Sequence, residues 1–203
     1  MSYRGKRALD LLVAGPALVL SLPVQAITAI AIRIKLGRPV LFRQARPGLN
    51  GEVFEMLKFR TMLLPDPERG LVTDADRMTR LGAFLRSTSI DELPTLWNIV
   101  RGDLSVVGPR PLLVQYLERY SPHQARRHEV RPGLTGLAQV NGRNAISWNE
   151  KFAYDVEYVD KHDLALDVRI ILRTALQVLR RDGISAGGEA TMPEFMGSTV
   201  PDA

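Results

Sequence analysis

The chain begins with a long apolar run that contains no charged residue. The run extends from Leu11 to Ile32, which gives a helix of about 33 Å, long enough to cross a bilayer. Basic residues flank both of its ends: Arg4, Lys6 and Arg7 precede it, and Arg33, Lys35 and Arg38 follow it. Because basic flanks favour the cytoplasmic side of a membrane, two such flanks favour placing both ends there. The pattern therefore predicts a re-entrant, monotopic helix over residues 1–36.

Proline determines where such a helix bends. Pro23 lies near the middle of the run and leaves the Val19 carbonyl without its helical donor. Ser21 and Gln25 can satisfy the loosened backbone, so we predict a bend at Ser21 and Pro23. Two other interpretations stay open. One is a secretory signal peptide with a cleavage-like site at Val24-Gln25-Ala26, and the other is an ordinary spanning helix that tolerates its prolines.

The remaining pattern predicts a mainly helical α+β domain over residues 37–185 and a tail over residues 186–203. Two short strands flank a turn rich in Gly and Asn and predict a hairpin. The expected elements are strands over 39–44 and 52–60, a helix over 76–85, a helix over 91–100 with Pro94 in its first turn, an amphipathic segment over 112–120, a loop over 131–136, a short strand over 137–140, a turn over 141–144, and helices over 147–160 and 164–181. The last helix has a basic, amphipathic face. This face fits an anionic bilayer surface or a core-facing helix with a solvated basic side.

Composition restricts the chemistry and the partners. The 27 Lys and Arg residues outnumber the 22 Asp and Glu residues, and the net charge of +5 favours anionic partners such as nucleotide phosphates or lipid headgroups. Cysteine is absent, which excludes disulfides, a thiolate nucleophile and Cys-based metal sites. The histidines at 123, 128 and 162 lack metal-ligand spacing. No nucleic-acid-binding motif is present, so we expect no nucleic-acid partner.

Two adjacent carboxylates, Asp91 and Glu92, lie between Arg86 and Arg110 in a segment rich in Pro and Gly. An acid among fixed cations can stay ionised and attack an electrophile while the cations hold an anionic substrate. The pattern suits phosphoryl transfer, with Asp91 as the nucleophile and Glu92 as the ligand of a Mg²⁺ ion that bridges to substrate phosphates. The alternative is structural, because the segment from Ser89 to Glu92 also matches a capping box at a helix start.

Three further groups of residues are candidates for substrate contacts. Arg110 lies between two prolines that fix its backbone, although this tripeptide also fits a plain rigid turn. Lys58 and Arg60 lie two positions apart on a predicted strand, so we expect them to share one face, where they could equally be solvated. The segment 133–144 is rich in Gly, Asn and Gln and includes Arg143. Its composition suits nucleotide contacts or a loop without function.

Taken together, the ordered motifs cover almost the whole chain. They are Lys6-Arg-Ala-Leu-Asp10, Phe42-Arg-Gln-Ala-Arg46-Pro47-Gly48, Lys58-Phe59-Arg60-Thr61-Met62, Arg86-Ser-Thr-Ser-Ile-Asp91-Glu92-Leu-Pro-Thr-Leu-Trp97-Asn98, Gly102-Asp103-Leu-Ser-Val-Val-Gly108-Pro-Arg110-Pro, Arg131-Pro-Gly-Leu-Thr-Gly136, Gln139-Val-Asn-Gly-Arg143-Asn144 and Asp155-Val-Glu-Tyr158-Val. With these motifs the chain resembles the bacterial sugar transferases of the monotopic phosphoglycosyl transferase family, especially the small PglC-like enzymes. One departure is Leu22, which precedes Pro23 where relatives have serine.

The resemblance implies an enzyme on the cytoplasmic face of the bacterial inner membrane that starts glycoconjugate assembly. Such enzymes transfer a sugar 1-phosphate from a UDP-sugar, usually N-acetylated in the small members, to undecaprenyl phosphate and release UMP. Asp91 would attack the β-phosphate and form a covalent phosphosugar intermediate in a ping-pong mechanism, while Glu92 would bind Mg²⁺. The substrate-binding residues that the resemblance implies are Lys58, Arg60, Arg86, Arg110, Gln139, Asn141, Arg143 and Asp155.

Two rival functions remain open at this stage. In the nearer one, Asp91 acts as a base while the lipid phosphate attacks the sugar nucleotide directly. In the other, the chain is a non-catalytic scaffold whose basic face binds anionic lipid. The sequence does not identify the sugar, the pathway or the oligomeric state.

Overall fold

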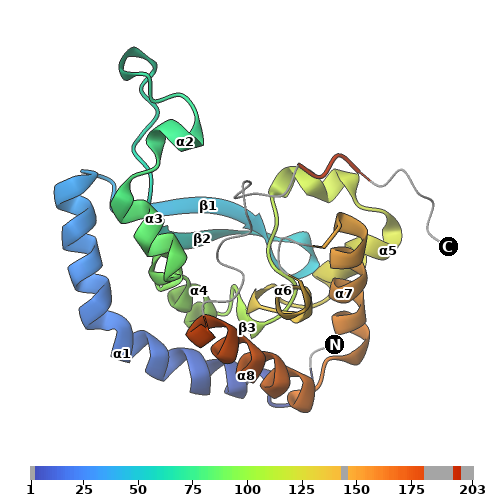
Figure 1. Cartoon of the computed structure of the whole chain (residues 1–203). Helices are drawn as coiled ribbons and strands as arrows, with labels where there is room; N and C mark the ends of the chain where they lie inside the picture. The colour runs from blue at the N-terminus through green and yellow to red at the C-terminus, as the bar shows by residue number, and fades with distance from the viewer. Residues whose placement is uncertain (1–2, 143–145, 181–193, 198–203) are drawn as a thin grey trace.

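The computed structural model describes residues 3–142, 146–180 and 194–197 (Figure 1). Helices predominate, and the strands form two small two-stranded sheets. The helices are α1 Lys6–Lys35, α2 Asp74–Arg77, α3 Arg80–Ser87, α4 Thr95–Arg101, α5 Pro122–Ala125, α6 Leu137–Asn141, α7 Trp148–Lys161 and α8 Leu164–Arg180. The strands are β1 Leu41–Pro47, β2 Val53–Phe59, β3 Ser105–Val107 and β4 Gly133–Thr135. This arrangement agrees with the predicted mainly helical α+β class.

Helix α1 remains one continuous helix through Pro16 and Pro23. In Figure 1 it follows a curved path along the lower and left edges of the molecule. The Ser21 hydroxyl donates to the Leu18 carbonyl at 2.9 Å, and the Gln25 amide donates to the Ser21 hydroxyl at 2.9 Å. Ser21 therefore bonds the carbonyl that precedes the one freed by Pro23, since prolines in helices deprive the carbonyl four residues earlier. The re-entrant path stays a prediction.

The first two turns of α1 are fixed to the rest of the domain by buried polar contacts. Asp10, only 2% exposed, accepts hydrogen bonds from the Ser105 hydroxyl at 2.7 Å and from the Val106 amide at 2.9 Å. The Lys6 ammonium forms a 2.6 Å ion pair with Asp167 of α8. These contacts fix the direction in which α1 leaves the domain.

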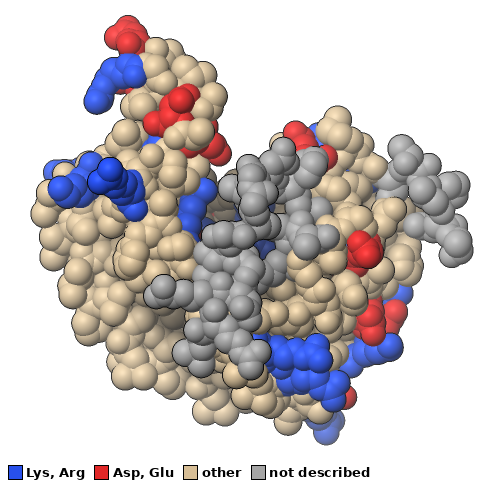
Figure 2. All heavy atoms as spheres, viewed as in Figure 1, with Lys and Arg blue, Asp and Glu red and all other residues tan. Residues whose placement is uncertain are grey.

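Beyond these turns, the outward side of α1 is apolar and exposed. Its exposed large side chains are Leu11, Leu12, Val19, Leu20, Leu22, Val24, Ile27, Ile30 and Ile34. By length and composition α1 could cross a membrane, and only 11% of its most apolar window is buried. Figure 2 shows basic side chains gathered at the upper left, where α1 ends, above a surface with few charges. Exposed apolar surface of this extent is typical of contact with lipid or with another protein.

The predicted hairpin is confirmed. Strands β1 and β2 pair antiparallel, with Leu41 opposite Phe59 and Pro47 opposite Val53. Between them, the turn places Asn50 in the left-handed region at φ 55°, which asparagine tolerates better than most residues. The hairpin forms a platform on which α4 rests, because Asn98 of α4 accepts a hydrogen bond from the Leu57 amide at 3.0 Å.

The strand predicted over 137–140 is wrong, because these residues form α6. The loop predicted over 131–136 instead contains β4, which pairs in parallel with β3. A short apolar run carries no reliable period, so the sequence does not separate a strand from a buried helical turn. Gly133 permits the strand pairing, since a Cβ there would lie 2.1 Å from the Gly108 nitrogen.

The helix predicted over 76–85 is interrupted. Met78 is extended at φ −70° and ψ 127°, and it separates α2 from α3. Each piece has its own cap: the Thr73 side chain caps α2 in a capping box, and the Thr79 side chain accepts from the Gly82 amide at 3.0 Å. Capping by threonine on both sides stabilises the break. In Figure 1, α2 projects away from the body of the molecule.

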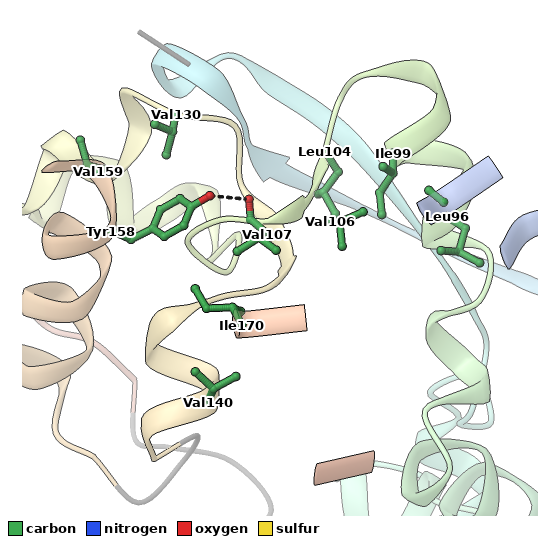
Figure 3. Packing of buried hydrophobic residues seen from close by; sticks show 11 residues of the cluster. Leu96, Ile99, Leu104, Val106, Val107, Val130, Val140, Tyr158, Val159 and Ile170 are labelled. Atoms are coloured by element: carbon green, nitrogen blue, oxygen red, sulfur yellow. Dashed lines mark hydrogen bonds between the residues drawn. The ribbon is translucent and has the colours of Figure 1, made fainter. Parts of the chain in front are cut away.

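The two C-terminal helices are confirmed, and they close the core. Ser147 caps α7 in a capping box with Glu150. Tyr158 of α7 is 1% exposed and donates its hydroxyl to the Val107 carbonyl at 3.1 Å (Figure 3). The cluster around it includes Leu96, Ile99, Leu104, Val106, Val107, Val130, Val140, Val159 and Ile170. This core joins α4, β3, α7 and α8 into one body.

One part of the C-terminal tail packs against the domain. Phe195 is 3% exposed and lies edge-on to Phe152, with ring centroids 4.9 Å apart. Tyr116 and Trp148 complete this aromatic cluster. Aromatic rings arranged in this way contribute beyond simple burial, which explains why residues 194–197 lie against the domain.

A substitution at Gly82 should displace α3. A Cβ at this position would lie 1.8 Å from the Thr61 carbonyl oxygen, a fixed backbone atom. We expect Gly82→Ala to lower the free energy of unfolding by about 1–3 kcal/mol, measured by thermal unfolding in detergent. Gly15→Ala is the control, because nothing lies within 4 Å of its Cβ and a helical Gly→Ala change is stabilising. Equal stability of the two variants would contradict the close packing of α3 on Thr61.

Candidate active site

The two adjacent carboxylates lie in a 3₁₀ turn (η3, Ile90–Glu92) between α3 and α4. The predicted helix therefore begins later than expected, at Thr95, with Pro94 as its N-cap residue. Ser89 adopts the left-handed conformation at φ 56° and its side chain caps nothing. The capping-box interpretation is therefore wrong, which leaves the Glu92 side chain available for other partners.

Glu92 accepts hydrogen bonds from two cations on the same oxygen atom. The Lys58 ammonium lies 2.7 Å from Oε1, and the Arg110 guanidinium lies 3.0 Å from it. Burial would raise the pKa of Glu92, but the charges of Arg110 and Lys58 outweigh burial and lower the pKa to about 2. Glu92 is therefore ionised throughout the physiological range.

Asp91 lies in a different electrostatic environment from its neighbour. It is 9% exposed, and burial together with the charge of Glu92 raises its pKa to about 6. Lys58 and Arg86 act in the opposite direction without reversing the shift. Desolvation is thus the larger effect on the pKa of Asp91. With a pKa near 6, Asp91 is mainly ionised at neutral pH and more basic than an ordinary aspartate.

Arg86 lies close enough to Asp91 to act on its pKa, and Arg110 pairs with Glu92. Arg86 is exposed and donates from Nε to the Thr61 hydroxyl at 3.0 Å. The Arg110 carbonyl accepts a hydrogen bond from the Arg127 guanidinium at 2.7 Å. Arg127 thus fixes the backbone of Arg110 from beneath.

Asp155 faces Arg127 rather than the carboxylates. Arg127 and Asp155 are each 2% exposed and form a 2.7 Å ion pair. Sequence reasoning missed Arg127, because it lies among the basic residues at positions 126–128 and has no motif of its own. Its partner Asp155 lies 28 residues further along the chain, so no local sequence signal could identify the pair.

Lys58 and Arg60 do not share a face. Strand β2 ends at Phe59, and Arg60 turns toward the C-terminal end of α1. Its guanidinium donates to the carbonyls of Leu36, Gly37 and Arg38. The structure therefore brings Lys58 to the carboxylates and places Arg60 at the end of the apolar helix, where it satisfies otherwise unpaired carbonyls.

The predicted nucleotide segment is only partly described. Gln139 lies in α6, and both of its buried side-chain amide atoms lack a hydrogen-bond partner. Asn141 donates to the Leu137 carbonyl at 3.0 Å. Arg143 lies outside the described residues. Nothing in these contacts joins the segment to the carboxylates.

The carboxylates of Asp91 and Glu92 suit a magnesium ion that is also held by substrate phosphates, and they do not form a site made of protein ligands alone. Within the described ranges there is no group of three or more His, Cys, Asp or Glu side chains that could hold a metal. Mg²⁺ commonly binds one or two carboxylates together with substrate phosphates and water. Asp91 and Glu92 meet that requirement, and no hydrogen bond of the described residues reaches Oε2 of Glu92.

Comparisons with known proteins show what the chain is similar to. Residues 1–181 match the family described as bacterial sugar transferase. The chain is 48% identical over 194 residues to the uncharacterized sugar transferase EpsL of Bacillus subtilis, covering 95% of this chain and 96% of that protein. It is 42% identical to a UDP-glucose:undecaprenyl-phosphate glucose-1-phosphate transferase of Caulobacter vibrioides, covering 87% of this chain and 70% of that protein. It is 38% identical to a UDP-galactose-lipid carrier transferase of Erwinia amylovora, covering 88% of this chain and 41% of that protein.

The chain belongs to the bacterial sugar transferase family. The resemblance seen in its motifs is therefore confirmed. Two of these relatives act on UDP-sugars and a lipid carrier according to their names. The family match over residues 1–181 includes both the apolar helix and the carboxylate turn.

Proposed function

We propose that this protein transfers a sugar 1-phosphate from a UDP-sugar to undecaprenyl phosphate and releases UMP. The names of its relatives support the two substrates. The apolar helix α1 supports a membrane location, which a lipid acceptor requires. The cations that surround Asp91 and Glu92 suit a diphosphate.

The observation that carries the proposal is the contrast between the two neighbouring carboxylates. Glu92 is paired with two cations and has a low pKa, whereas Asp91 is buried, less fully paired and has a raised pKa. Pairs of titratable groups whose environments separate their pKa values commonly divide a catalytic task. Asp91 is thus the better nucleophile, and Glu92 is the permanent anion.

The reaction proceeds in two steps in this proposal. In the first, an Asp91 carboxylate oxygen forms a bond to the β-phosphorus, and the bond to the oxygen bridging the two phosphates breaks, so UMP departs. In the second, an oxygen of the lipid phosphate attacks the same phosphorus. The Asp91–phosphorus bond then breaks, and a lipid diphosphate sugar forms. Two steps allow one site to serve a soluble and a lipidic substrate in turn.

Lys58, Arg110 and Arg86 hold the phosphates near Asp91. Glu92 orients Lys58 and Arg110 through its two hydrogen bonds. Together with Asp91, Glu92 would hold Mg²⁺. The ion, when bound, offsets the repulsion between the attacking carboxylate and the diphosphate.

A burst experiment tests the covalent step. The enzyme is mixed with UDP-sugar without lipid acceptor, and the UMP released is counted against the enzyme concentration. We expect one UMP per active site within the first turnover and none from Asp91→Asn. If lipid-dependent turnover is fast but UMP appears only with the acceptor, Asp91 acts as a base and the covalent step is wrong.

The donor sugar is tested with a panel. One of the named relatives uses UDP-glucose and another uses UDP-galactose by their names, whereas the resemblance to small family members favours N-acetylated sugars. Turnover with undecaprenyl phosphate is therefore compared for UDP-glucose, UDP-galactose and their N-acetylated counterparts. The preferred sugar is the one with the highest kcat/KM.

The pH dependence of turnover should report the ionisation of Asp91. As an attacking group Asp91 must be ionised, and its pKa is raised to about 6 by burial and by Glu92. We expect kcat/KM to rise about tenfold per pH unit below pH 6 and to level off above it. Glu92, with a pKa near 2, should add no inflection between pH 4 and 8. A profile that is flat from pH 4.5 to 7.5 would contradict this role of Asp91.

We further propose that α1 enters the cytoplasmic leaflet and returns, so that the carboxylates lie at the membrane surface. The curvature of α1 and its basic ends support this path. Because the chain contains no cysteine, single cysteines at Arg4 and Lys35 can be labelled separately in sealed vesicles. Equal accessibility from the cytoplasmic side supports the re-entrant path, and opposite accessibility would establish a spanning helix.

A further inference from the structure

The hairpin presents two different faces to its surroundings. Directly opposite residues on paired strands point to the same side of a sheet. Arg46 lies opposite Phe54, and Lys58 lies opposite Phe42. Arg46 is four residues from Phe42 along β1, so Arg46 and Lys58 point to the same face. Arg43 occupies the other face.

The face that carries Lys58 and Arg46 is turned toward the catalytic turn and the Pro109–Pro111 segment. Lys58 reaches Glu92 at 2.7 Å. Arg46 donates from Nη1 to the Pro111 carbonyl at 3.3 Å. The two cations therefore lie at opposite ends of one surface, and Arg110, the residue before Pro111, reaches the same Glu92 oxygen as Lys58.

Arg46 is a half-buried guanidinium with an incomplete set of partners. Besides the Pro111 carbonyl, it contacts the Gln44 side-chain oxygen at 2.6 Å through Nη2. Its Nε is buried and has no hydrogen-bond partner. Both of these acceptors are neutral, and within the described part of the chain Arg46 forms no ion pair. A buried donor without a partner is costly.

The charge of Arg46 is opposed rather than balanced by its neighbours. Burial, together with the charge of Arg110, lowers the pKa of Arg46 to about 10. Lys58 and Arg110, in contrast to Arg46, have an anionic partner, because both contact the Glu92 carboxylate. Two guanidinium groups held together with one carboxylate leave an excess positive charge on the side of Arg46. Such an excess suits an anion, and arginine suits phosphate in particular.

We infer that Arg46 is a phosphate-binding residue that holds the phosphate of the departing nucleotide through its guanidinium group. The inference rests on the proposed function. Asp91 and Glu92 lie at the Lys58 end of the surface. Arg46 lies beside the Pro109–Pro111 segment, from which Arg110 reaches Glu92. The β-phosphate that Asp91 attacks therefore lies near Lys58, and the α-phosphate bonded to it lies on the Arg110 side, next to Arg46.

The test compares nucleotide binding by Arg46→Gln and Arg43→Gln. Arg43 is on the same strand, is exposed and pairs with Glu55 at 3.0 Å on the opposite face, so Arg43→Gln is the matched control. Calorimetry with the full chain in detergent uses UMP and uridine as probes. We expect Arg46→Gln to weaken UMP binding about 10- to 100-fold and to leave uridine binding and the control unchanged. Unchanged UMP affinity in Arg46→Gln would overturn the inference.

A second measurement separates direct contact from displacement of Arg110. Arginine Nε–H resonances are recorded on ¹⁵N-labelled wild-type protein, and the Arg46 resonance is assigned by its loss in Arg46→Gln. Direct binding predicts that UMP shifts this resonance and that uridine does not. No shift on saturation with UMP would show that Arg46 only supports the Pro111 backbone, and the inference would be wrong.

The outcomes also separate this inference from the proposed function. A wild-type burst of UMP together with unchanged UMP affinity in Arg46→Gln leaves the function intact and removes the role of Arg46. Absence of both the burst and UMP binding in the wild-type protein would remove both.

Discussion

Asp91→Asn is expected to abolish sugar-phosphate transfer and, at the same time, to stabilise the fold. Loss of the nucleophile should reduce turnover at least about a thousandfold. The pKa of Asp91 is about 6 in the folded state and 3.8 in the unfolded state. The folded state therefore binds the Asp91 proton more tightly than the unfolded state. The contribution of Asp91 to stability is therefore fully present below about pH 3.8 and is lost as the pH rises through 6. At neutral pH the ionised carboxylate costs about 3 kcal/mol, which asparagine removes.

Thermal unfolding between pH 4 and 8 checks this prediction. The difference in Tm between Asp91→Asn and the wild type should be several degrees at pH 7.5 and should shrink toward pH 4. Glu92→Gln is the matched control on the neighbouring residue. Because the pKa of Glu92 is lowered, its ionised carboxylate stabilises the fold above about pH 4.5, and this contribution is lost as the pH falls toward 2. Glu92→Gln should therefore be less stable than the wild type at pH 7.5. Destabilisation by Asp91→Asn at pH 7.5 would contradict the electrostatic contrast.

Asp155→Ala is expected to produce the largest loss of stability. The substitution leaves the buried Arg127 charge without its carboxylate, and breaking one partner of a buried pair costs about 3–5 kcal/mol. Arg127 would also lose its fixed position beneath the Arg110 carbonyl. We therefore expect Tm to fall by about 10 °C and kcat/KM for the UDP-sugar to fall with it.

Asp160→Ala is the control for this prediction. Asp160 lies on the same helix as Asp155, but it is about half exposed and pairs with Arg126 at the surface. Exposed ion pairs contribute little, so Tm should change by less than about 2 °C. If Asp155→Ala keeps the wild-type Tm and only raises KM, Asp155 contacts the substrate directly and its structural role is refuted.

Sequence patterns located the long elements well and the short ones poorly. The apolar run, the hairpin and the two C-terminal helices were predictable, because each has a strong period or strong turn chemistry. The region 133–141 was not, since strand β4 and helix α6 are only three and five residues long. In pieces this short, contacts such as that between Gly133 and Gly108 decide the conformation.

The candidate site was predictable in its residues and less so in its contacts. The motifs identified Asp91, Glu92, Lys58 and Arg110, and the structure places them together. Two details depend on the fold. The pKa of Asp91 is set by burial, which no motif encodes. Arg127 reaches Arg110 only because α7 places Asp155 beside it, and pairs separated by 28 residues leave no local pattern.

Peptide mapping of the trapped enzyme tests the central claim most directly. The wild-type protein is mixed with UDP-sugar in the absence of lipid, quenched with acid and digested with trypsin. Cleavage after Arg86 and Arg101 gives one peptide that contains both carboxylates. We expect this peptide to gain the mass of one sugar phosphate, with fragmentation assigning it to Asp91. Stoichiometric UMP release with no adduct on this peptide, or an adduct on Glu92, would contradict the proposed mechanism.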